Sequence, residues 1–249
     1  MTSLYIGCMA VALCAQTPEY GYDVASIKPS GMGTNNSRIA PGPQGGMRAQ
    51  NVTTLQLLTF AYDVRDYQFV SVPGWAKSDR FDVSFTPDTP EAAPDAAMGR
   101  EKMEGLFNRQ RLRTRAVLRD RFGLVVVLES REMPVYGLTL AKGGHKLKKT
   151  ETESDGPRMQ NNGTQLTGLS VYLSMLTNSL ASIIGRPVVN ETGLDGPFDF
   201  KMAWTAENDP AGGASIFTAI QEQLGLKLES RKGPVAVFVI EKMQKPSEN

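Results

Sequence analysis

The octapeptide LESREMPV at residues 128–135 recurs as LESRKGPV at residues 228–235, and six of the eight positions are identical. Each copy follows an apolar residue and a glycine and precedes an apolar run. A recurrence at this separation indicates that one supersecondary unit is used more than once. The octapeptide therefore predicts a repeat architecture, and it carries information about the fold rather than about chemistry.

Glycines after apolar residues mark the ends of three predicted helices. These pairs are Phe122-Gly123, Ile184-Gly185 and Leu224-Gly225. A glycine just past a helix adopts the left-handed conformation without a Cβ clash and lets the chain turn into a strand. We expect about four units of helix, glycine, strand, turn and strand. Helices on one face of short, mostly antiparallel strands define an α+β fold.

Apolar periodicity places the elements between these glycines. A helix is expected from Thr53 or Thr54, and a second from about 102 to 122. The clearest stripe, from Leu169 to Ile184, predicts a third helix, and Ser215 is the expected N-cap of a fourth. Strands are expected at 20–27, 69–72, 80–85, 124–128, 135–141, 187–189, 198–204 and 236–240. Residues 31–46 have loop composition, and each octapeptide is expected to form a corner between two strands.

The domain organisation follows from composition. Residues 1–15 contain a short apolar run and both cysteines, Cys8 and Cys14, which fits the apolar region of a signal peptide. A buried N-terminal strand or helix is the alternative interpretation of this run. Residues 16–142 and 164–249 are predicted as two α+β halves, joined by the polar linker 143–163. Export to the periplasm or the exterior is therefore expected, with no membrane span once the signal peptide is removed.

Composition and charge exclude several classes of function. The chain has 249 residues, 41% apolar and 21% charged, and a net charge of +1, which gives no electrostatic attraction to nucleic acid. His145 is the only histidine, and it lies in a polar loop. No zinc-protease, calcium-loop or phosphate-loop motif occurs. We therefore expect no metal and no cofactor.

Two pairs of aspartates are the candidates for catalysis by carboxylates alone. Asp79 and Asp82 bracket Arg80-Phe81, whereas Asp195 and Asp199 flank a Gly-Pro turn. Paired carboxylates are the groups that glycosidases use. The favoured interpretation is structural, with Asp195 in a turn and Asp82 and Asp199 on the outward faces of strands.

Three residues are the candidates for ligand or partner binding: Trp75, Arg131 and Arg231. Trp75 follows a Pro-Gly turn, and an exposed tryptophan is suited to binding, whereas Trp204 is expected in the core. Each arginine ends a Glu-Ser-Arg triplet of the octapeptide and could bind an anion. The alternative is a weak cross-strand Glu–Arg pair at a corner, with Leu128 and Leu228 buried and both arginines exposed.

Several phrases resemble a known family across nearly the whole chain after residue 15. They are YDVASIKPS (22–30), YDVRDYQFVSVPGW (62–75), RFDV (80–83), LRDRFGLVV with ESREMPVYGLTLAKGG (118–144), GRPVVNETGLDGPFDF (185–200) and the C-terminal LGLKLESRKGPVAVFVIEKMQKPSEN. The chain resembles a family of exported proteins of unknown activity, abundant in Solibacter-type acidobacteria. A similar domain is attached to some membrane metallopeptidases of the antibiotic-sensor type.

A weaker likeness is to the short N-terminal domain of secretins and TonB-dependent receptors, which is a periplasmic docking module. These resemblances supply no catalytic residues. We expect an exported, non-enzymatic protein that docks an envelope partner by strand addition or binds a ligand. The alternatives are an extracytoplasmic hydrolase that uses carboxylates only, and a sensor domain associated with a membrane metallopeptidase.

Overall fold

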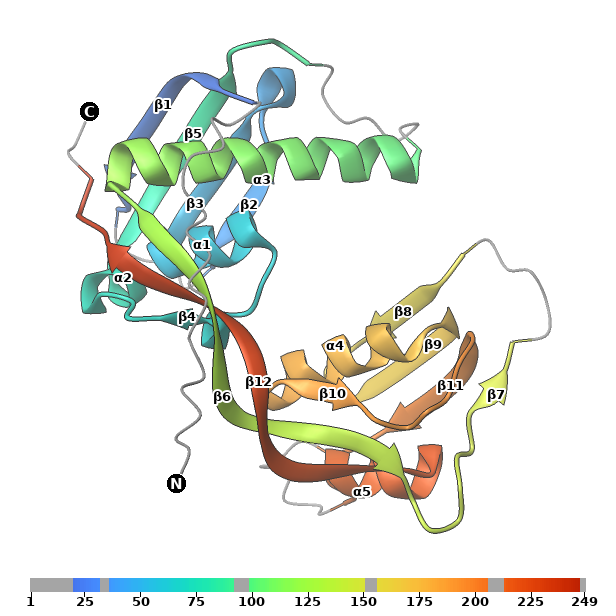
Figure 1. Ribbon diagram of the computed structural model, residues 1–249. Helices are drawn as coiled ribbons and strands as arrows, with labels where there is room; N and C mark the ends of the chain where they lie inside the picture. Colours follow the sequence, from blue (N-terminus) through green and yellow to red (C-terminus); the bar gives the residue numbers. More distant parts are fainter. Residues whose placement is uncertain (1–19, 32–35, 92–98, 151–155, 206–212, 247–249) are drawn as a thin grey trace, which may run out of the picture. The chain divides into compact units, whose positions relative to one another are not determined.

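The computed structural model describes residues 20–31, 36–91, 99–150, 156–205 and 213–246 (Figure 1). The predicted signal peptide, residues 1–15, lies outside the described residues. The chain divides into two compact units. Unit 1 contains residues 1–130 and 236–249, and unit 2 contains residues 131–235. Five α-helices and three four-stranded sheets are described, so the α+β prediction is confirmed.

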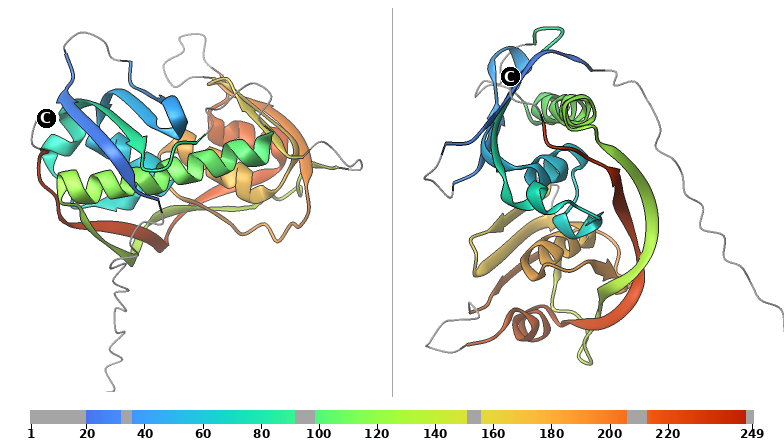
Figure 2. Two further views of the ribbon diagram at one scale, coloured as in Figure 1. Left: turned by 90° about the horizontal axis from the view of Figure 1, so that it is seen from above. Right: turned by 90° about the vertical axis from the view of Figure 1, so that its left-hand side faces the viewer.

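Unit 1 is built on an antiparallel sheet of order β1-β5-β3-β2. Its strands are β1 (Tyr22–Pro29), β2 (Arg38–Pro41), β3 (Met47–Thr53) and β5 (Arg80–Pro87). The helices α1 (Thr54–Tyr62) and α3 (Arg100–Phe122) lie on one face of this sheet (Figure 2). The core between them contains the fully buried Ile27, Val52 and Leu58. Thr53 caps α1 and forms a capping box with Gln56, as a threonine in this position predicts.

Unit 2 is built on an antiparallel sheet of order β7-β11-β9-β8. Its strands are β7 (Lys148–Lys149), β8 (Arg158–Asn161), β9 (Gln165–Val171) and β11 (Phe198–Ala203). The helices α4 (Leu173–Ile184) and α5 (Ile216–Ala219), and the π-helical turn η3 (Ile220–Leu224), complete the unit. Its core contains Leu166, Leu176 and Met202, none of which is exposed.

Two long strands, β6 (Val125–Leu140) and β12 (Leu226–Lys242), are neighbours in the third sheet. Within unit 2, β10 (Val188–Asn190) pairs in parallel with β6. Within unit 1, β4 (Phe69–Val70) pairs in parallel with β12, close to the short helix α2 (Gly74–Ser78). The edge strands β10 and β4 are very short, and short edge strands limit the exposed sheet edge.

The two units have the same plan. The outer sheets have the orders β1-β5-β3-β2 and β7-β11-β9-β8. In each sheet, the strand that comes first in the sequence lies next to the fourth, and the third and second follow. This count leaves out β4 and β10, which belong to the third sheet. Each unit then runs from its third strand directly into a helix, and from its last helical segment through a glycine into one of the long strands. The structure therefore shows two units that share this plan, and the expected repeat of about four shorter units stays a prediction.

One polar cluster occurs in both units. In unit 1 the Asp82 carboxylate accepts hydrogen bonds from the Asn51 N–H at 2.8 Å and the Ser30 hydroxyl at 3.0 Å. In unit 2 the Asp199 carboxylate accepts from the Ser170 N–H at 2.7 Å and the Thr150 hydroxyl at 2.8 Å. Asn51 and Ser170 both have φ of 53°, a left-handed conformation uncommon outside glycine, at irregular positions of β3 and β9. The aspartate stabilises this backbone turn just before each helix.

The glycine caps are as predicted. Gly123, Gly185 and Gly225 have φ of 57°, 69° and 65°, and each follows the last residue of a helical segment. The structure differs at the octapeptides, because each lies within one continuous strand, and no corner forms there. The chain at these positions is flanked by only one other strand, since β10 reaches residues 136–138 of β6 and β4 reaches residues 238–239 of β12. Charged residues and prolines are tolerated in such a two-stranded stretch.

Two other boundaries differ from those predicted. The expected linker, residues 143–163, supplies β7 and β8 to the sheet of unit 2, so it does not lie between the two units. The helix expected from Leu169 begins at Leu173, because residues 165–171 form β9. Leu169 is 49% exposed. Its spacing from the apolar residues of the helix matched the helical period by coincidence.

Candidate functional site

A pocket of about 410 Å³ lies in unit 1, beside the C-terminal end of β1. Pockets of this size are in the range that holds small ligands or single side chains. Its apolar walls come from four residues on three segments: Ile27, Pro29, Phe81 and Pro246. Its polar residues are Asp79, Arg80 and Lys245. The pocket thus combines an apolar surface with a small number of charged groups.

An ion pair accounts for two of these charges. The Lys245 ammonium lies 2.7 Å from the Asp79 carboxylate, and both side chains are more than a third exposed. The Ser78 hydroxyl also donates to Asp79, at 2.9 Å. Hydrogen bonds from Lys245 and Ser78 hold the pKa of Asp79 below its ordinary value, so this carboxyl is ionised at neutral pH. Exposed pairs of this kind contribute little to stability and exchange partners readily.

Arg80 supplies a further positive charge. One nitrogen of its guanidinium donates to the Asn51 carbonyl oxygen at 2.7 Å and to the Ser37 hydroxyl at 2.9 Å. Both partners are neutral, and no ion pair of Arg80 occurs within the described part of the chain. The side chain is therefore fixed in place while its charge is not neutralised by a carboxylate. The pocket has one more positive than negative group.

The β1 strand forms an edge of its sheet beside this pocket, because it pairs only with β5. Ser30 N–H donates to the Arg80 carbonyl oxygen, so alternate residues of β1 face β5, and Ala25 and Ile27 face the open side. Arg121 covers part of this side by donating to the Ala25 carbonyl oxygen at 3.1 Å. Pro29 has no N–H to offer. Ile27 lies between these two positions and is itself buried, at 1% exposed.

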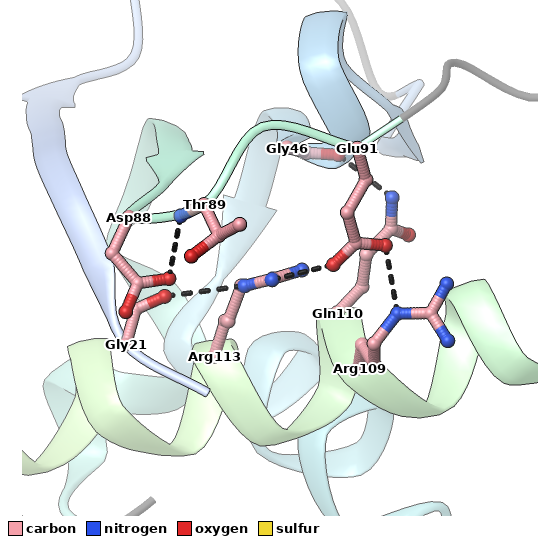
Figure 3. Close-up of polar contacts among 8 residues, drawn as sticks. All are labelled: Gly21, Gly46, Asp88, Thr89, Glu91, Arg109, Gln110 and Arg113. Atoms are coloured by element: carbon pink, nitrogen blue, oxygen red, sulfur yellow. Dashed lines mark hydrogen bonds and ion pairs between the residues drawn. The ribbon is translucent and has the colours of Figure 1, made fainter. Parts of the chain in front are cut away.

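A second cluster of charges in unit 1 holds α3 in place (Figure 3). The Glu91 carboxylate accepts from Arg113 at 2.6 Å and from Arg109 at 2.7 Å, and Arg113 also donates to the Gly21 carbonyl oxygen. The Arg113 side chain is 1% exposed. Burial alone would raise the pKa of Glu91, but the hydrogen bonds from Arg113 and Arg109 outweigh it and lower this pKa. Both charges of the buried pair are engaged, so this cluster is structural.

None of the three predicted binding residues lines the pocket. Trp75 lies on α2 of unit 1, where it is half-buried against the core. Arg131 lies on β6 and is half-buried, whereas Arg231 is exposed on β12 and pairs with Glu191. A Glu–Arg pair was the expected alternative, and the glutamate that pairs with Arg231 is Glu191, just after β10. A binding role for these three residues stays a prediction.

The predicted burial at the octapeptides is corrected in part. Leu128 and Leu228 are half-buried instead of buried, and Arg131 is half-buried instead of exposed. Both leucines lie in a continuous two-stranded stretch without a corner, so neither side chain is turned fully into a core. Arg231 is exposed, as expected.

The aspartates considered for catalysis have structural partners. Asp82 and Asp199 stabilise the left-handed residues described above, and Asp79 pairs with Lys245. Asp195 accepts from the Gly196 N–H within its own turn, as predicted. Hydrogen bonds lower the pKa of Asp79, which is the opposite of what a general acid needs. The geometry gives no support to the hydrolase alternative.

His145 is exposed in its loop, and its ring lies 5.8 Å from that of Phe198. Across the residues that the structure describes, no three histidine, cysteine or acidic side chains are grouped to hold a metal ion. Likewise, none of the helices described is both long and apolar enough to cross a membrane.

Sequence reasoning missed the pocket, although it had singled out Asp79. The lining residues come from positions 27–29, 79–81 and 245–246, and no local spacing connects them. The only signal was the charged pair Asp79-Arg80 at the start of an alternating strand. Lys245 carried no signal, because it follows the last predicted strand.

The comparisons with known proteins give a family and no activity. A family model described as "Protein of unknown function (DUF3738)" matches residues 55–243. No curated protein and no solved structure matches the chain.

Proposed function

The chain belongs to the DUF3738 family, and we propose that it is an exported docking protein without catalytic activity, which binds a short extended segment of a partner at β1. The observation that carries this proposal is the edge position of β1 next to a pocket with an apolar floor. An extended segment that adds to a sheet edge gains backbone hydrogen bonds, and pockets for its side chains provide specificity.

The open part of the edge limits the length of the added segment. Arg121 occupies the Ala25 carbonyl oxygen, Pro29 lacks a donor and Ile27 between them is buried, whereas Asp23 and Val24 at the start of β1 are exposed. Natural proteins protect edge strands in such ways against nonspecific pairing. The segment that this edge admits is therefore short.

Export is the second part of the proposal, and it rests on the sequence alone. Residues 4–15 are apolar and are followed by the polar Gln16-Thr17-Pro18, as at the end of a signal peptide. N-terminal sequencing of the protein isolated from its native cells tests this part. A mature chain that begins near Gln16 is expected, and a cytosolic chain that retains Met1 would contradict export.

Docking at β1 is tested by proline substitutions at the two edges of the same sheet. Asp23→Pro changes an exposed residue of β1 that lies at the irregular position of its pairing with β5, so the remaining ladder to β5 is kept. Ile39→Pro is the matched control, because Ile39 faces the open side of β2, at the opposite edge. The ligands are acetylated five-residue peptides of alternating valine and threonine that end in leucine, and their affinity is measured by fluorescence anisotropy.

We expect Asp23→Pro to weaken peptide binding by about tenfold or more, which corresponds to the loss of roughly one hydrogen-bonded contact. Ile39→Pro should bind like the wild type. Thermal melts of both variants show whether the fold is kept. Equal loss in both variants, or no binding of any peptide by the wild type, would contradict docking at β1.

A further inference from the structure

We infer that the exposed edge of β12 in unit 2 pairs two copies of this chain, in an antiparallel ladder centred on Ser230. The surface consists of residues 228–232, which belong to the second octapeptide. It is a different surface from β1, so the inference does not rest on the proposed docking function. It identifies the partner at this edge as a second copy of the same strand.

The first step is the direction in which the backbone groups of β12 point. The Lys227 carbonyl oxygen faces β6, since it accepts a hydrogen bond from the Thr139 hydroxyl at 3.4 Å. The Ala236 carbonyl oxygen faces the other side, where it accepts from the Gln68 side chain at 3.1 Å. Successive residues of a strand direct their backbone groups to opposite sides. The even-numbered residues of β12 therefore direct their N–H and carbonyl groups away from β6.

The outward side of β12 is unpaired over residues 228–232. β4 reaches only Phe238 and Val239, and no other described strand pairs with this side of β12. Residues 229–232 are exposed, and Leu228 is half-buried. An exposed strand with unpaired N–H and carbonyl groups is a template for pairing with another chain.

The second step is that this segment is complementary to itself. A two-fold axis places the same segment on both sides of an interface. With Ser230 on the axis, the two Ser230 residues exchange backbone hydrogen bonds, and so do Leu228 and Lys232 across the interface. Glu229 of each copy then lies opposite Arg231 of the other. These are the non-hydrogen-bonded pairs of the ladder, in which opposing side chains are closest.

Charge favours this register over its neighbours. Centring the ladder on Glu229, Arg231 or Lys232 would place identical charges opposite each other, which is destabilising. Centring it on Leu228 would end the ladder at the buried first residue of β12. Only the ladder centred on Ser230 combines opposite charges with a full set of outward backbone groups.

The pairs that these charges already make are compatible with the interface. Lys227 lies 2.9 Å from Glu229, and Arg231 pairs with Glu191. A carboxylate accepts at both oxygens and a guanidinium has five donors, so each group can bind a second partner. The interface would join these pairs into one network of alternating charges, and networks contribute more than isolated exposed pairs.

The test is the oligomeric state of the full chain, measured by analytical ultracentrifugation from about 1 µM to about 1 mM. We expect a dimer whose population rises with concentration. Ser230→Pro removes an N–H that points away from β6, so it should weaken the dimer by about tenfold or more. Lys201→Glu changes an exposed lysine on β11 of the same unit and should dimerise like the wild type.

Two charge reversals test the register. Glu229→Arg would place two arginines opposite each other, and Arg231→Glu would place two glutamates opposite each other. Each variant alone should therefore be monomeric at concentrations at which the wild type dimerises. Mixed in equal amounts, the two variants should associate, because each reversed residue then faces an opposite charge. Loss of the pairs with Lys227 or Glu191 within one chain cannot produce this recovery.

A wild-type chain that stays monomeric over the whole range would overturn the inference, and this measurement needs no variant. A dimer that Ser230→Pro leaves intact would also overturn it, as would folded reversal variants that do not associate when mixed. Where thermal melts show that a reversal fails to fold, Glu229→Gln and Arg231→Gln take its place, since they remove the attraction without adding repulsion. Both should weaken the dimer, and unchanged dimerisation of both would overturn the inference.

Discussion

At the scale of single residues, two kinds of charge differ: those that are paired with an opposite charge within the fold, and the charge of Arg80, which is not. Glu91 lies between Arg109 and Arg113, and the latter is almost completely buried. A buried charge without its partner is strongly destabilising. Arg80 differs, because its partners are a hydroxyl and a carbonyl oxygen. This contrast separates the structural arginines of α3 from the arginine of the pocket.

The Glu91 cluster predicts a pH dependence of stability. Since the folded-state pKa of Glu91 is lowered, its contribution is fully present above the ordinary value of 4.5 and is lost as the pH falls through the folded-state value. Glu91→Gln should lower the free energy of unfolding at pH 7 by about 2 kcal/mol or more, because Arg113 loses its counter-charge. The difference between variant and wild type should shrink below about pH 4.5. Urea unfolding at several pH values measures it.

Arg119→Gln is the control for this prediction. Arg119 pairs with Asp120 at 2.6 Å on the exposed side of α3. Loss of an exposed pair should cost under about 1 kcal/mol. A Glu91→Gln variant whose deficit does not change with pH would show that its effect comes from packing instead of from the ion pairs.

At the scale of secondary structure, helix termination is the feature that the sequence predicted best. An apolar residue followed by glycine ended a helical segment in three places. The reason is that a residue in the left-handed conformation after a helix is preferentially glycine. The octapeptide was misinterpreted for an equally physical reason. Charged residues and a proline next to glycine have the composition of a turn, but pairing with a neighbouring strand keeps them extended. Pairing of this kind is non-local and leaves no trace in a short window of sequence.

The glycine caps differ in the space around them, and this predicts unequal costs. Nothing lies within 4 Å of a Cβ placed on Gly185, whereas a Cβ on Gly225 would clash with the carbonyl oxygen of Gly144. Gly185→Ala should therefore cost about 1 kcal/mol, the strain of the left-handed conformation alone. Gly225→Ala should cost clearly more, because backbone must move as well. Thermal or urea unfolding of the two variants provides the comparison, and equal costs would contradict this assignment of the space around each glycine.

At the scale of the whole molecule, the two units share a plan, while the repeat that the octapeptide predicts stays a prediction. The two outer sheets have the same strand order, and Asp82 and Asp199 make matching hydrogen bonds. The short likenesses RFDV at 80–83 and PFDF at 197–200 become evident only once the structure aligns them. Strands β2, β3, β7, β8 and β9 were missed because glycine-rich and polar composition resembles that of loops. The pocket was missed because its residues come together only through the sheet.

The most direct test of docking at β1 is amide hydrogen exchange of the full chain, with and without an acetylated five-residue peptide of alternating valine and threonine that ends in leucine. Slower exchange is predicted at Asp23 and Val24, the exposed start of β1, and unchanged exchange at Ile39 on the opposite edge of the sheet. Slower exchange confined to unit 2, or bound peptide with unchanged exchange in β1, would contradict docking at β1.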